Sequence, residues 1–134
     1  MQRYDPLKAP DPEEWLSLDE QQRIDVVEEY HRLAGIRIPN AKIHAVAHAI
    51  IENQIAAGDK LPVRRTVQRL MAEGLDRHEA IHAVGMILLE FINDVMKQAD
   101  TEQAERQADP NAPYYAALEK LTAESWRELW RQSD

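Results

Sequence analysis

The chain has 134 residues, of which 44% are hydrophobic and 30% charged; it contains no cysteine and carries a formal net charge of −8. This length supplies one hydrophobic core, and the lack of cysteine excludes disulfide frameworks, thiolate catalysis and cysteine-ligated zinc or iron–sulfur sites. The acidic balance argues against nucleic acid and anionic membranes as partners, and the absence of a long apolar run or an apolar N-terminal segment predicts a cytoplasmic protein.

Glycine, proline and capping residues mark helix starts and ends, and they predict four helices within the first 98 residues. A capping box formed by Ser17 and Glu20 predicts a first helix over about 18–34, and Asn40 is a suitable N-cap for a second over 41–57. Pro62 suits the first turn of a third helix over 62–73, and a capping pattern at Asp76 and Glu79 opens a fourth over 77–98. Three of these helices end at a glycine, as helices do when the next residue is left-handed; these glycines are Gly35, Gly58 and Gly74.

The remaining segments read as connections and a docked C-terminal helix. Residues 36–38 are too short for a strand, and the polar stretch 99–112 has no apolar periodicity. The tail is helical, with Thr122 capping a last segment whose apolar side chains, including Trp126, are expected to pack on the bundle. Short connections favour antiparallel neighbours, so we predict an all-α, four-helix up-down bundle with an additional C-terminal helical segment. We divide the chain into an N-terminal extension (1–16), the bundle (17–98), and an acidic linker with an amphipathic helix (99–134).

Two pairs of histidines, each four residues apart, are the most informative feature. His44 with His48, and His78 with His82, each lie on one helix face, close enough for both imidazoles to reach one metal ion. Both pairs occupy the first two turns of helices that run parallel in this topology, so all four should meet at one end of the bundle. His31 comes to the same end, but near a helix C-terminus we interpret it as a residue favoured by the helix dipole.

The sequence therefore predicts a divalent-metal site, with zinc the first choice for imidazole ligands. Glu52, one turn after His48, is a further candidate ligand or a partner of one. Four ligands would close a structural site, whereas three would leave a position for water that Glu79 or Glu52 could deprotonate. The rival hypothesis is a non-enzymatic interaction module whose histidines form a buried hydrogen-bonded network.

Residues 78–82 also fit the H-E-x-x-H pattern of zinc peptidases, in which the glutamate is the general base. Against this function, the capping pattern gives Glu79 a structural role, and the motif starts at the very beginning of its helix. Other metal-dependent hydrolysis stays an alternative. A di-iron site is disfavoured because the two Glu-x-x-His pairs, at Glu28–His31 and Glu79–His82, lack the full set of further glutamates. A homodimer in which the two histidine pairs meet across two chains is also open.

About half the chain, from Tyr30 to Val95, resembles an uncharacterised family of small bacterial helical domains, a domain of unknown function. The shared pattern is an H-x-x-x-H helix followed by a glutamine, and then R-H-E-x-x-H at the start of a later helix. Its positions here are His44, His48 and Gln54, then Arg77, His78, Glu79 and His82. The resemblance implies a bacterial cytosolic helical domain without a known activity, and it suggests that the four histidines belong together.

Overall fold

The computed structural model describes residues 3–36, 40–98 and 109–133, and every regular element within these ranges is helical. The predicted all-α class is therefore confirmed. The predicted linkers at 36–38 and 99–112 lie largely outside the described residues. The helices are α1 (Pro12–Ser17), α2 (Glu20–Leu33), α3 (Ala41–Ala56), α4 (Val63–Ala72), α5 (Arg77–Gln98), α7 (Ala112–Lys120) and α8 (Ala123–Ser133), with a short 3-10 turn, Gly58–Lys60, before α4.

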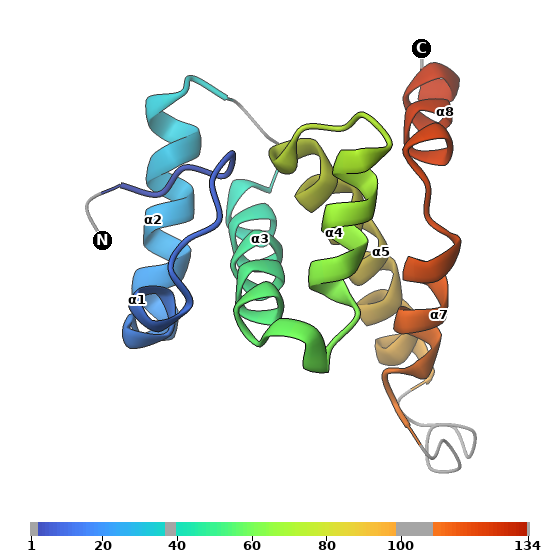
Figure 1. The fold of residues 1–134 in the computed structure, drawn as a ribbon, viewed down its shortest axis with the longest axis horizontal. Helices are drawn as coiled ribbons and strands as arrows, with labels where there is room; N and C mark the ends of the chain where they lie inside the picture. Colours follow the sequence, from blue (N-terminus) through green and yellow to red (C-terminus); the bar gives the residue numbers. More distant parts are fainter. Residues whose placement is uncertain (1–2, 37–39, 99–108, 134) are drawn as a thin grey trace.

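Helices α2 to α5 alternate in direction, and α7 with α8 lies along the far side of α4 and α5 (Figure 1). This arrangement agrees with an up-down bundle followed by a C-terminal helical segment. Trp126 of α8 is only 5% exposed, as expected of a side chain that packs on the bundle. None of the helices in the described ranges is both long enough and apolar enough to cross a bilayer.

Local signals set most of the helix ends. Gly35, Gly58 and Gly74 all have positive φ, which only glycine adopts without strain and which ends the preceding helical segment. The predicted capping box at the start of α5 is present: the Glu79 amide donates to the Asp76 carboxylate at 2.8 Å, and the Asp76 amide donates back to Glu79 at 3.3 Å. The fourth predicted helix accordingly has the observed bounds.

The predicted capping box at Ser17 is wrong. Ser17 is the last residue of α1, and α2 is instead capped by Asp19, whose carboxylate accepts from the Gln22 amide while the Gln22 side chain accepts from the Asp19 amide. The reason is tertiary, because the short helix α1 buries Trp15 completely, and the chain must finish that helix before α2 can start.

The core consists of two apolar clusters that share α3. The larger one joins α3, α4, α5, α7 and α8 around side chains such as Ile51 and Leu70. The smaller one packs the N-terminal segment, α1 and α2 against the other side of α3, with Tyr4 and Trp15 at its centre. Residues 3–16, assigned from sequence to an extension, thus contribute buried side chains to the fold. The ring of Trp15 also donates a 2.8 Å hydrogen bond to Asn53 on α3.

Candidate metal centre

Three helix ends bring all five histidines together. His31 lies in the last turn of α2, His44 and His48 in the first turns of α3, and His78 and His82 in the first turns of α5. Alternation of helix direction places these ends side by side, as the sequence predicts. The imidazole rings pack tightly, with centroids 4.2 Å apart for His78 and His82 and 4.5 Å apart for His44 and His82.

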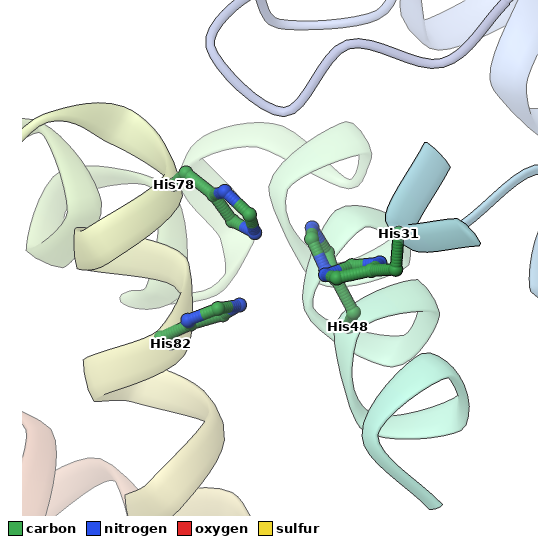
Figure 2. A group of neighbouring side chains, drawn as sticks. All are labelled: His31, His48, His78 and His82. Carbon is green, nitrogen blue, oxygen red and sulfur yellow. The ribbon is translucent and has the colours of Figure 1, made fainter. Parts of the chain in front are cut away.

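Four of the five rings form a group that could hold one metal ion. One ring nitrogen from each of His31, His48, His78 and His82 lies within 4.8 Å of the others. Figure 2 shows these rings facing one another, two from α5 on one side and one each from α2 and α3 on the other. His31 and His48 are buried, with 6% and 2% of their surface exposed, while His78 and His82 are half-buried.

His44 lies beside this group, with its ring against those of His31 and His82. The Nε2 atoms of His31 and His44 are 3.3 Å apart. The Nδ1 of His31 lies 2.8 Å from the Val27 carbonyl oxygen, which can only accept, so Nδ1 carries the proton and Nε2 of a neutral ring has a lone pair. His44 therefore donates to the one nitrogen of His31 that is able to bind a metal, and this hydrogen bond would have to break for His31 to bind an ion.

Three further imidazole nitrogens are buried without any hydrogen-bond partner among the described residues: His48 Nδ1, His78 Nε2 and His82 Nε2. Leaving a buried polar atom unpaired costs about 1–3 kcal/mol, so such atoms are uncommon in native proteins. Here three occur in neighbouring rings of one small cluster. A shared metal ion would satisfy all of them at once.

The orientation of His48 is fixed by a chain of buried polar groups. The Tyr4 hydroxyl donates its single hydrogen to the Glu52 carboxylate and lies 2.6 Å from His48 Nε2. Since that hydrogen is used, His48 Nε2 must donate to the hydroxyl oxygen, which leaves Nδ1 as a lone pair. Metal-binding histidines characteristically donate their second ring nitrogen to an oxygen in this way.

An ion pair anchors the far end of this chain. Arg77 donates to both oxygens of Glu52, at 2.7 and 2.8 Å, and also to the Pro6 carbonyl at 2.9 Å. Glu52 is 1% exposed and Arg77 6% exposed, so both charges are removed from water and depend on one another. The segment around Tyr4 and Pro6 thus belongs to the support of the cluster.

The surroundings of His44, His48, His78 and His82 favour the neutral form of these four imidazoles. Burial, reinforced by neighbouring histidines, lowers the pKa of His82 to about 3 and that of His44 to about 4. Burial together with His31 lowers the pKa of His78 to about 4, and that of His48 falls well below its usual value. Neutral imidazole is the form that coordinates a metal ion, so the rings are ready to bind at neutral pH.

These lowered pKa values predict acid sensitivity of the chelator-treated protein. Each unfolded histidine gains a proton near pH 6.5 while the folded one resists until about pH 4, so the stability that the neutral rings contribute is complete above pH 6.5 and is lost as the pH falls. We expect unfolding near pH 5 to take up about three to four protons. Urea denaturation between pH 7.5 and 4.5 measures this slope. The variant His44→Gln should lower the uptake by about one proton, and a flat profile above pH 5 would contradict the prediction.

Glu79 and Glu52, the two carboxylates predicted to act at the site, both form interactions that stabilise the fold. Glu79 is exposed and completes the capping box of α5. Glu52 is held by Arg77 and Tyr4, and it reaches the cluster through the tyrosine hydroxyl that contacts His48. Neither belongs to the four-residue group. Their predicted roles as general base and ligand stay predictions.

The structure adds to the group one histidine that the sequence did not predict as a metal ligand. His31 joins the group in the place expected for His44. The signal was present, because the antiparallel first helix brings His31 to the same end of the bundle. Its position near a helix C-terminus led instead to an interpretation based on the helix dipole.

Comparison with known proteins adds no relative: no family model, curated protein or solved structure matches this chain.

Proposed function

We propose that the protein binds one divalent metal ion, zinc in the first instance, through His31, His48, His78 and His82. The observation that supports this proposal most strongly is the set of three unpartnered buried nitrogens on His48, His78 and His82 within one group of four neighbouring imidazoles. The neutral state of the rings and the Tyr4–Glu52 support of His48 favour the same function. Imidazole ligands suit zinc, although other transition metals share this preference.

We infer a structural or ligand-binding site rather than a peptidase. A hydrolytic site of the H-E-x-x-H type needs its glutamate at a metal-bound water, whereas the Glu79 carboxylate accepts a hydrogen bond from the backbone of Asp76. Four histidine ligands satisfy the tetrahedral coordination of zinc without a metal-bound water. The net charge of −8 supports the proposal that the protein binds neither nucleic acid nor anionic membranes. We also propose a cytoplasmic location.

The second candidate function is an interaction module with a buried histidine network. One observation favours it: His44 and His31 already contact each other through their Nε2 atoms. A purely hydrogen-bonded network, however, gives no partner within the described residues to the three unpaired nitrogens. The metal proposal accounts for these atoms and the network proposal does not.

Metal content of the full chain, purified without a histidine tag or chelator, tests the proposal. We expect about one zinc ion per chain by elemental mass spectrometry, and we expect His82→Ala to lose it because one of four ligands is removed. Glu79→Ala is the matched control on the same helix and should retain the metal, since the change removes only a cap. A chain that takes up neither zinc, nickel, cobalt nor iron, even when these are added, would refute the metal function and leave the network.

A further inference from the structure

An apolar pocket adjoins the histidine cluster on the side of α5 and α8. Its volume is about 310 Å³, which is at the lower end of the range for small-molecule sites. His44, His48 and His82 line it together with apolar side chains, and the described part of the lining includes no aspartate, glutamate, lysine or arginine. The other lining residues are Ile36, Ala47, Ile81, Gly85, Met86, Leu89 and Trp126.

Gly85 on the pocket wall has no structural reason to be glycine. It lies in the middle of α5, where glycine costs about 0.5–1 kcal/mol relative to alanine. Its φ is not positive, unlike that of the three glycines at helix ends. Gly85 is buried, yet a Cβ added to it would meet no atom of the described residues within 4 Å. Because a side chain at this position would extend into the pocket, the glycine keeps that space open.

The charge of the proposed centre indicates what the pocket holds. Four neutral imidazoles would leave a divalent ion with its full positive charge in a largely buried place. Glu52, the buried carboxylate that is linked to His48 through Tyr4, is already neutralised by Arg77 at 2.7 Å. Asp5 and Asp76 lie near enough to His78 to act on its charge, but neither they nor any other described carboxylate lines the pocket. A bound anion would therefore supply negative charge on the pocket side of the ion.

From these observations we infer that the pocket binds a small organic monocarboxylate, with its carboxylate toward the metal and its apolar body against Met86, Leu89 and Trp126. The inference rests on the proposed metal function. It adds a ligand class that combines an anionic head, matched to the charge of the centre, with an apolar body, matched to the lining. His48 and His82 line the pocket and are themselves proposed ligands, so a molecule in the pocket lies next to the ion.

Cobalt(II) in place of zinc gives the test a direct readout, because its visible absorption changes when an anion joins the four histidines as a fifth ligand. We expect sodium phenylacetate to change the spectrum of the cobalt-loaded full chain saturably, and to bind at least tenfold more tightly than acetate. Phenylacetamide, which has the same shape without the charge, should have no effect. Gly85→Leu should weaken phenylacetate binding at least tenfold, whereas Gly85→Ala, which leaves most of the space, should not.

The outcomes separate this inference from the function on which it rests. Cobalt uptake with no response to phenylacetate, or with equal responses to acetate and phenylacetate, would overturn the pocket inference and leave the metal site. A chain that binds no cobalt would overturn both. The comparison of phenylacetate, acetate and phenylacetamide uses the unaltered chain, so it decides the question even where Gly85→Leu impairs folding.

Discussion

Zinc should raise the melting temperature of the chelator-treated protein by about 10 °C or more when its free concentration is about a thousand times the dissociation constant, a stabilisation of about 4 kcal/mol. His31→Ala should abolish this shift, because it removes a member of the four-residue group. His44→Ala should keep most of it, because His44 lies beside the group and is not one of its four members. Differential scanning calorimetry with and without zinc measures the effect.

This pair of variants separates the ligand set favoured by the structure from the one expected from sequence. Each variant must first show helical circular dichroism and a cooperative transition in chelator, so that loss of the shift reports on metal rather than on folding. Loss in His44→Ala with retention in His31→Ala would restore the sequence-based set. No shift in the unaltered chain would favour the hydrogen-bonded network.

Arg77→Met should destabilise the protein by about 3–5 kcal/mol, because it leaves the Glu52 carboxylate buried without its partner charge. This is a large share of the about 5–15 kcal/mol that holds a typical domain folded. Adding Glu52→Gln should recover part of the loss, since a neutral amide does not need a counter-charge. Urea denaturation in chelator, at pH 7.5, gives the free energies of unfolding for the cycle.

An exposed ion pair provides the matched control. Lys42 and Glu28 are 3.0 Å apart, with 61% and 38% of their side chains exposed although the Oε1 of Glu28 is buried, and Lys42→Met should cost about 1 kcal/mol. An Arg77→Met variant no less stable than Lys42→Met would show that the buried pair contributes little. That result would also contradict a role for Arg77 and Glu52 in holding Tyr4 against His48.

Both the spacing of residues along each helix and the packing between helices determine which histidines belong to the cluster. Spacing of four residues guarantees that His78 and His82 share a face of α5, and the structure places both in the group. On α3 the same spacing places His44 and His48 on one face of the helix, but it does not say which of them points to the centre of the cluster. The packing of α2 against α3 decides that His48 faces the centre while His44 lies next to His31.

Features that depend only on neighbouring residues could be predicted from the sequence. The capping pattern at Asp76 and Glu79 and the left-handed glycines after the helices act within a few residues, so they predict the bounds of α5 and the ends of α2 and α4 closely. Short connections then dictate alternating helix directions, which is enough to gather five histidines at one end.

Features that join residues far apart in the sequence depend on how the helices pack. Tyr4 and Glu52 are 48 positions apart, and Arg77 lies 25 positions beyond Glu52, so no local pattern announces that the three share one buried chain of hydrogen bonds. The choice of Asp19 over Ser17 as a cap, and of His31 as a member of the group, likewise depended on which surfaces were buried. Burial is a property of the packed chain, and it is burial that makes these polar groups interact strongly.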